Sequence, residues 1–219
     1  AQAASGRHCI ATQGKSKVYL SARDLMSCCE ECGNGCNGGY PEMAYEYIKQ
    51  NGLVTGSWDN KNNSYCLKYP FLSCMHHTAG SPQCSDYDFD TPQCVHSCDA
   101  QSTWPISWKQ DKIRFSSAYS LRNEADIMKD VYQNGPITVS FAVYEDLLSY
   151  RSGTYRHVSG SLLGYHVVSL VGWGVDTDGT KYWKIANNWN KNWGMNGRFN
   201  IVRGVDECGI ESSANAGLP

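Results

Sequence analysis

The stretch HVVSLVGWGVDTDGTKYWKIANNW, residues 166–189, predicts the element on which the fold depends. Two runs rich in β-branched and aromatic residues, 166–175 and 181–189, flank a short polar segment. Within that segment Asp178-Gly179 favours a tight hairpin turn, because Asp and Gly tolerate the positive φ angles that such a turn requires. The stretch therefore predicts two neighbouring antiparallel strands.

Similar patterns continue on both sides of this hairpin. Residues 137–143 and 198–204 also have the composition of strands, and residues 123–134 have the apolar spacing of a helix. The second half of the chain is therefore expected to form an antiparallel sheet. We predict an α+β fold with two lobes, residues 1–115 and 116–219, and a ligand-binding cleft between them.

The first half of the chain predicts short helices joined by long, polar loops. Ser21 can cap a short helix that has Asp24 in its first turn. Residues 41–51 place apolar side chains on one helical face, and Gly52 ends that pattern. The predicted apolar face consists of Met43, Ala44, Tyr47 and Ile48.

Length and charge exclude several classes of protein. A chain of 219 residues can bury a hydrophobic core, and 19 Lys and Arg against 21 Asp and Glu give a net charge of −2. No basic run would attract nucleic acid or an anionic membrane, and no apolar stretch reaches the ~20 residues of a membrane span. We expect no nucleic-acid or membrane partner and no cofactor. The chain begins without a signal-peptide pattern, so we expect that any targeting segment has been removed.

The cysteine content indicates an oxidising compartment. The chain has 11 cysteines, most of them in polar loops of the first half, and an odd count leaves at least one thiol unpaired within the chain. Asn62-Asn63-Ser64 is an N-glycosylation sequon, with Asn62 as the candidate acceptor. A zinc site is the weaker interpretation, because structural zinc prefers spaced ligand pairs to adjacent cysteines. Its candidate ligands are Cys28, Cys29, Cys32, Cys36, His76 and His77.

His166 and Asn187 are the candidate catalytic residues of the predicted hairpin. His166 starts the longest predicted strand, and the returning strand brings Asn187 close to it. A carboxamide can hold one imidazole nitrogen and fix the tautomer, so that the other nitrogen acts as a base, while Trp189 shields the hydrogen bond from water. The alternative is a structural histidine beside core indoles at Trp183, Trp189 and Trp193, which fits these residues equally well.

Several motifs carry a family resemblance that runs through the whole chain. They are CNGGYP (36–41), HVVSLVGWG (166–174), YWKIANNWNKNWGMNG (182–197) and ECGIE (207–211). Together they resemble the papain-like cysteine peptidases, in which a His and an Asn lie far downstream of the catalytic Cys. Cys28-Cys29 and the segments CMHHTAGSPQC (74–84) and DTPQC (90–94) resemble the cathepsin B branch of that family.

The resemblance implies a papain-like two-lobe fold and a peptidase site. His166 would be the catalytic histidine, Asn187 its orienting residue and Trp189 the indole over both. Gly38 and Gly39 would offer backbone hydrogen bonds to an extended substrate. The family's nucleophile belongs to a C-G-(S/A)-C-(W/Y) segment, which does not occur in this sequence. We therefore expect the chain to lack the segment that carries the nucleophile and part of the oxyanion hole, and to be inactive by itself.

The resemblance also implies a disulfide pattern. Cys28 would pair with Cys94, Cys29 with Cys32, Cys66 with Cys98, and Cys74 with Cys84. Cys208 would stay free, and Cys9 and Cys36 would be unpaired in this chain because their family partners lie in the missing segment. A replacement disulfide between Cys9 and Cys36 is an alternative that the sequence leaves open.

Segment 74–84 resembles the occluding loop of the cathepsin B branch. Its histidines, His76 and His77, would bind a substrate's terminal carboxylate and direct the enzyme to carboxy-terminal dipeptides. Ser213 stands where that branch has an acid at the floor of the main specificity pocket. Val167, predicted to bind substrate, replaces an alanine directly after the histidine, so that it and Tyr165 crowd the site. Without the acid, we expect the pocket to favour apolar side chains over Arg.

Two function classes follow from these expectations. In the first, the chain is the main part of a lysosomal, endosomal or secreted cysteine endopeptidase and carboxy-terminal dipeptidase, whose nucleophile would come from a separate amino-terminal light-chain segment or was lost with it. In the second, it is a catalytically dead homologue that binds peptides. The implied partners are peptide or protein substrates and protein or electrophilic inhibitors. Tyr165 and Asn188, where the family has Gly and Ser, bear on substrate preference.

Overall fold

The structure is a computed structural model that describes residues 1–219 and divides into two compact units. The first unit comprises Ala1–Ser73, Asp88–Tyr119 and Ala216–Pro219, and the second comprises Cys74–Tyr87 and Ser120–Asn215. This division differs from the predicted lobes in three places, the first of which is that residues 116–119 belong to the first unit. Segment 74–84 belongs to the second unit, where Asn190 binds it. The last residues belong to the first unit, where Ser116 N donates to Leu218 O at 2.7 Å.

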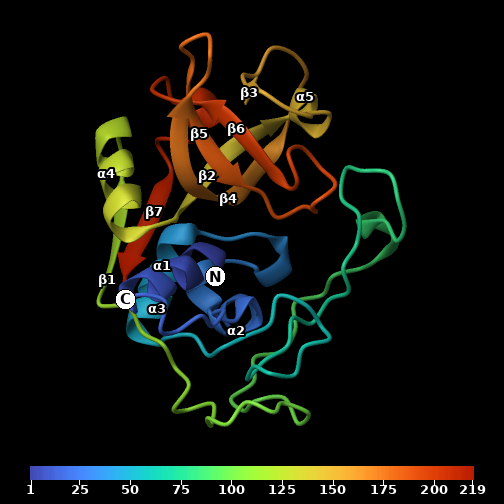
Figure 1. The fold of residues 1–219 in the computed structure, drawn as a ribbon. Coiled ribbons are helices and arrows are strands. Elements are labelled where there is room, and N and C mark those ends of the chain that lie inside the picture. Colours follow the sequence, from blue (N-terminus) through green and yellow to red (C-terminus); the bar gives the residue numbers. More distant parts are fainter. The chain divides into compact units, whose positions relative to one another are not determined.

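Three α-helices form the centre of the first unit (Figure 1). They are α1 (Gln2–Ala11), α2 (Ala22–Cys28) and α3 (Pro41–Gln50), and short 3-10 turns follow α2 at Glu30–Cys32 and Gly35–Asn37. Ser21 caps α2 as predicted, because its hydroxyl accepts a hydrogen bond from Asp24 N at 3.0 Å. Pro41 occupies the start of α3, where a missing N–H has no cost to helical hydrogen bonding. No helix of the chain has the length and apolar character that crossing a bilayer requires.

The buried face of α3 differs from the predicted one. Ile48 is buried as expected, but the second buried side chain is Tyr45, and Met43, Ala44 and Tyr47 are only partly covered. Tyr45 is drawn inward because its ring packs against Phe115, which lies far away in the sequence. The apolar core around it consists of Ala4, Leu20, Tyr45, Ile48, Leu53 and Phe115.

Four disulfides are present, and they confirm the implied pattern. They join Cys28 to Cys94, Cys29 to Cys32, Cys66 to Cys98, and Cys74 to Cys84. Cys9, Cys36 and Cys208 are free, so the alternative Cys9–Cys36 disulfide does not form. Most of the cysteines considered as zinc ligands are therefore already bonded to other sulfurs.

The strands of the chain form one mixed sheet with the order β1-β7-β2-β4-β5-β6-β3, and β2, β3, β4, β5 and β6 lie wholly in the second unit (Figure 1). β2, β4, β5 and β6 pair antiparallel in that order, β2 pairs antiparallel with β7, and β3 pairs parallel with β6. The strands are β1 (Ser117–Leu121), β2 (Ile137–Tyr144), β3 (Thr154–Tyr155), β4 (Leu162–Val175), β5 (Lys181–Ala186), β6 (Arg198–Val202) and β7 (Ala214–Leu218). With the helices of the first unit, this sheet confirms the predicted α+β class.

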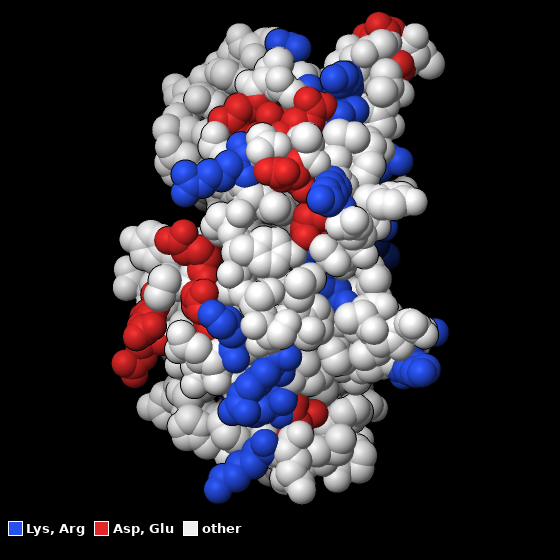
Figure 2. All heavy atoms as spheres, turned by 90° about the vertical axis from the view of Figure 1, so that its left-hand side faces the viewer, with Lys and Arg blue, Asp and Glu red and all other residues white.

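Two α-helices and two 3-10 turns complete the second unit. They are α4 (Glu124–Asn134), α5 (Glu145–Leu148), Cys84–Asp86 and Glu207–Gly209. The Asn123 side chain caps α4 by accepting from Asp126 N, and Gly135 ends the helix with a φ of 94°. On the face drawn in Figure 2, Lys and Arg side chains lie among Asp and Glu side chains, in keeping with a net charge close to zero.

The predicted hairpin is formed by β4 and β5. Its turn is closed by Asp176 N donating to Thr180 O at 2.8 Å, with Gly179 at a φ of 86°. β4 begins at Leu162, so the expectation that His166 starts this strand was wrong: pairing with β2 extends β4 toward the amino terminus. His166 lies inside the strand, opposite Phe141.

One carboxylate holds the segment that leads into β4. Asp146 accepts hydrogen bonds from Tyr155 Oη at 2.6 Å, Val158 N at 2.9 Å and Ser159 N at 3.2 Å, and its Oδ2 lies 3.2 Å from Nδ1 of His157. Burial raises the pKa of Asp146, but these hydrogen bonds outweigh it and bring the pKa down to about 2. The ionised carboxylate of Asp146 is therefore more stable in the folded protein than in the unfolded chain.

Asp146→Asn is expected to remove a pH-dependent part of the stability. A pKa lowered from 3.8 to about 2 stabilises the fold above about pH 4, and this contribution is lost as the pH falls toward 2. The free energy of unfolding of the variant should therefore be lower at pH 6 and approach that of the unchanged protein near pH 2, as measured by urea denaturation. Asp88→Asn, which changes an exposed carboxylate, is the control. A difference that stays constant from pH 6 to pH 2 would contradict this assignment.

Candidate active site

The hydrogen bond between His166 and Asn187 fixes the state of the imidazole. Nε2 of His166 lies 2.9 Å from Oδ1 of Asn187, which follows the end of β5. The same Oδ1 accepts the backbone N–H of Asn188 at 2.8 Å. An amide oxygen has no proton to give, so Nε2 must carry the proton and donate it. Nδ1 is therefore the nitrogen with the free lone pair, as a general base requires.

Aromatic rings cover this hydrogen bond. The indole of Trp189 stacks on the imidazole of His166 with ring centroids 5.2 Å apart and an interplanar angle of 27°. Phe141 presents its ring at 6.1 Å from the imidazole, and Trp193 supports Trp189 at 4.8 Å. Because these rings exclude water, the hydrogen bond from Nε2 is stronger than an exposed one would be.

The surroundings of His166 favour the neutral imidazole. Burial lowers the pKa of His166, the hydrogen bond to Asn187 raises it, and the charge of His77 lowers it, so that the pKa lies below its ordinary value. A thiolate placed beside Nδ1 would act in the opposite direction, because it would stabilise the imidazolium. His166 is thus suited to act as a base that is neutral by itself and becomes charged only when a thiolate lies beside Nδ1.

The disulfide-closed loop brings two further histidines to the same indole. The rings of His76 and His77 lie 4.0 Å apart, and the ring of Trp189 lies 5.5 Å from His76 and 4.6 Å from His77. Burial lowers the pKa of His76, and the charges of His77 and His166 lower it further. The three histidines that the sequence singled out therefore share one indole and influence one another's charge.

Two predicted substrate-binding residues, Val167 and Ser213, lie on either side of Ser140 in β2. Val167 pairs with Ser140, and Ser140 N donates to Ser213 O at 3.0 Å. Val167 is 36% exposed, and Asn188 Nδ2 donates to its carbonyl oxygen at 3.0 Å. Tyr165, two residues before Val167, is 79% exposed and leaves the imidazole uncovered by its ring.

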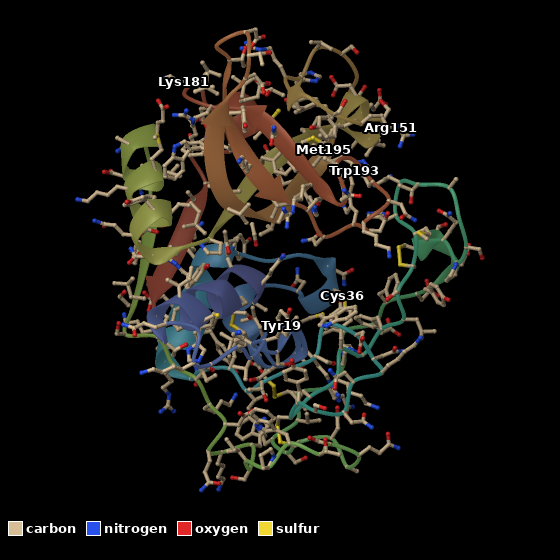
Figure 3. The ribbon with its side chains drawn as sticks, in the orientation of Figure 1. Tyr19, Cys36, Arg151, Lys181, Trp193 and Met195 are labelled. Atoms are coloured by element: carbon tan, nitrogen blue, oxygen red, sulfur yellow. A yellow bond between two sulfur atoms is a disulfide. The ribbon has the colours of Figure 1, made fainter.

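Gly38 and Gly39 lie in the first unit, next to the turn that contains free Cys36 (Figure 3). Gly38 has a φ of 106°, and a Cβ built on it would meet no atom within 4 Å. A Cβ on Gly39 would lie 2.2 Å from Cys32 O, so a side chain there would clash with the backbone. Packing alone therefore requires Gly39, whereas the space beside Gly38 is open, although its carbonyl already accepts a hydrogen bond from Asn34 N at 2.8 Å.

Free Cys208 is not a suitable nucleophile. Burial raises its pKa, the charge of Glu207 and a hydrogen bond to that carboxylate raise it further, and Asp146 adds to the effect, to about 12. A thiol with this pKa carries almost no thiolate at neutral pH. The second unit thus combines an imidazole held by an amide with a free thiol that is not reactive.

One residue of the site was not predicted. Asn190 binds the loop that carries His76 through Nδ2, which donates to His76 O at 2.7 Å. Its position directly after Trp189 was visible in the sequence, but its partner lies more than a hundred residues away. Only the folded structure shows that contact.

Comparisons with known proteins bear on the family and the fold of the chain. Residues 1–218 match the family model described as papain family cysteine protease. A "Cathepsin B-like cysteine proteinase" of Schistosoma japonicum is 45% identical over 219 residues, which are 99% of this chain and 63% of that protein. "Cathepsin B-like cysteine proteinase 6" of Caenorhabditis elegans is 45% identical over 221 residues, covering 100% of this chain and 58% of that protein. The chain thus spans about three fifths of the curated relatives it matches.

Solved structures show the same fold. "ProCathepsin B S9 from Trypanosoma congolense" superimposes with a TM-score of 0.82 at 40% identity, covering 100% of this chain and 66% of that one. The proform of the "Amb a 11 cysteine protease", a ragweed pollen allergen, gives a TM-score of 0.70 at 21% identity over 99% of this chain and 56% of that one. At that identity the second match supports the fold alone.

Proposed function

Because this chain belongs to the papain family of cysteine proteases and has the family's α+β fold, we propose that it forms most of a cathepsin B-like peptidase. One observation carries the proposal: the Asn187 amide holds His166 with Nε2 protonated and Nδ1 free. The C-G-(S/A)-C-(W/Y) motif of the family nucleophile is not among these 219 residues. The proposed reaction therefore uses a thiol outside them, and the chain alone is inactive.

The proposed reaction is hydrolysis of a peptide bond through an acyl-enzyme. Nδ1 of His166 takes the proton of the thiol, and the thiolate attacks the peptide carbonyl. The imidazolium then gives that proton to the leaving amine, which departs as the new amino terminus. Nδ1 next takes a proton from water, whose oxygen attacks the thioester, and the thiol recovers the proton as the acid is released. Asn187 keeps Nε2 protonated throughout.

We propose that His76 and His77 give the site a preference for carboxyl termini. Both rings lie against Trp189, beside the catalytic histidine, and an imidazolium can pair with a substrate's terminal carboxylate. Cleavage at His166 would then release a carboxy-terminal dipeptide in addition to internal cleavage. Gly38 would bind the extended backbone of the substrate.

The pocket at Val167 and Ser213 is proposed to accept apolar side chains. Ser213 offers no carboxylate to neutralise an Arg side chain, so burial of a guanidinium there would be unfavourable. The proposed setting is lysosomal, endosomal or secreted, in keeping with the four disulfides and with an Asn62 sequon held in a turn by Asn62 Oδ1 and Ser64 N. The proposed partners are peptides, proteins and inhibitors of cysteine peptidases.

A matched pair of peptides tests the function. The full-length protein should cleave a peptide with a free carboxyl terminus and release its last two residues, detected by mass spectrometry, and should also cleave the amidated peptide internally. A full-length protein that binds these peptides without cleaving either one is instead the inactive homologue.

Peptides with Phe or Arg at the second residue before the cut test the pocket, and an equal kcat/KM for both would refute its apolar preference.

The double variant His76→Ala/His77→Ala is expected to separate the two activities. Dipeptide release should fall about tenfold or more, the size of a lost charge-assisted contact, because the carboxylate loses its partners. Cleavage of the amidated peptide should stay within about threefold, because His166 and Asn187 are untouched. An equal fall in both activities would count against a carboxylate-binding role.

A further inference from the structure

The side chain of Asn190 connects the disulfide-closed loop 74–84 to the segment that follows β5, the strand before Trp189. Nδ2 donates to His76 O at 2.7 Å, and Oδ1 accepts from Thr78 Oγ1 at 3.3 Å. Oδ1 also accepts from Asn192 N at 2.9 Å, two residues further along its own chain. This local bond fixes the amide, because the oxygen must face Asn192 N and the nitrogen must then face the loop.

The loop itself is stiff within its own boundaries. Cys74–Cys84 closes it, Met75 N donates to Pro82 O at 2.7 Å, and Gln83 Nε2 donates to Thr78 O at 3.1 Å. These bonds hold the loop together without attaching it to the sheet. A loop of this kind moves as one body, so its position depends on its external contacts.

The external contacts centre on Asn190 and its neighbours. The two hydrogen bonds of Asn190 hold His76 and Thr78, and the indole of Trp189 lies against both histidine rings. A weaker contact joins Asn192 Nδ2 to Met75 Sδ at 3.7 Å. Trp189 is also the ring that covers His166, so consecutive residues hold both the loop and the catalytic imidazole.

We propose that Asn190 is a positioning residue that latches the loop 74–84 beside His166 and thereby sets the balance between dipeptide release and internal cleavage. The catalytic consequence of this inference rests on the proposed function. The hold of Asn190 on the loop does not, because it depends only on contacts within this chain. While the hydrogen bonds of Asn190 to the loop are formed, His76 and His77 occupy the place that a longer substrate would fill. When these bonds are lost, the loop moves away from Trp189 and longer peptide chains can reach His166.

Hydrogen exchange tests the latch without any catalytic activity. In Asn190→Ala, backbone amides of residues 75–80 should exchange faster by roughly 5- to 100-fold, the effect of losing two neutral hydrogen bonds. Thr78→Val, which removes only the second bond, should give a smaller increase. Lys191→Ala, a change at the adjacent exposed side chain, is the matched control and should leave these amides unchanged. Amides of β4 and β5 should keep their rates in every variant.

Two outcomes of this measurement would overturn the latch. Unchanged exchange in residues 75–80 of Asn190→Ala would show that other contacts hold the loop. Faster exchange in β4 and β5 as well would show that Asn190 supports the whole unit. Thermal unfolding of each variant separates this second outcome from a local opening of the loop.

Kinetics of the full-length protein then test the consequence. Asn190→Ala should lower the ratio of dipeptide release to internal cleavage by about fivefold or more, whereas Lys191→Ala should keep the ratio of the unchanged protein. A ratio unchanged in Asn190→Ala, despite faster exchange in the loop, would refute the effect on specificity. Absence of hydrolysis in the unchanged protein would refute the proposed function, and the exchange experiment would still decide the latch.

Discussion

His166→Ala in the full-length protein is expected to lower kcat/KM for peptide hydrolysis by at least about 10³-fold. In the proposed reaction the imidazole takes the thiol proton and returns it to the leaving amine, and a methyl group can do neither. Asn187→Ala should have a smaller effect, about 10- to 100-fold, because the base remains but Nε2 loses its acceptor. Initial rates with the amidated peptide, at enzyme concentrations fixed by absorbance, measure both variants.

Another histidine of the same unit supplies the control. His157 stacks on Tyr144 with ring centroids 3.7 Å apart and contacts Asp146. These contacts do not include the imidazole of His166. His157→Ala should keep kcat/KM within about threefold, provided the variant stays folded. A His166→Ala protein that retains more than a tenth of the original kcat/KM would rule out the proposed role of this histidine.

The hairpin that carries His166 and Asn187 could be predicted because its information is local. Asp178-Gly179 specifies the turn, and the turn fixes the pairing from Val175–Lys181 to Gly172–Lys184, before a register shift between Leu170 and Gly172 moves the two strands by one residue. Once Ala186 pairs with Ser169, Asn187 must come close to the amino-terminal part of β4. The contact between His166 and Asn187 follows from strand pairing over about twenty residues, a distance at which sequence patterns are informative.

Other features depend on contacts that no local pattern contains. β4 extends beyond the predicted strand because it pairs with β2, and Tyr45 is buried because Phe115 packs on it. The bond from Asn190 to His76 joins two loops, and loop positions have no periodicity from which to predict them. The disulfides were predictable only through the family resemblance, since spacing alone leaves many pairings open.

Trp193 packs against Trp189, and we expect both the candidate site and the stability of the second unit to depend on it. Trp193 is fully buried, and its ring lies 4.8 Å from Trp189, 5.6 Å from Tyr150 and 5.6 Å from Phe199. Its Nε1 donates to Leu148 O at 3.1 Å, so the indole also ties α5 to the loop after β5. Figure 3 shows Trp193 close to the start of β6, among the side chains of this unit.

Trp193→Ala is therefore expected to lower the free energy of unfolding by about 3–5 kcal/mol, because the large cavity cannot close and Leu148 O loses its donor. Trp193→Phe keeps a ring in the cavity and should cost roughly half as much. Trp58→Ala, at an indole that is 68% exposed, should change the stability by no more than about 0.5 kcal/mol. Urea denaturation measures all three variants. A loss below about 1 kcal/mol in Trp193→Ala would mean that the rings around Trp189 support one another without it.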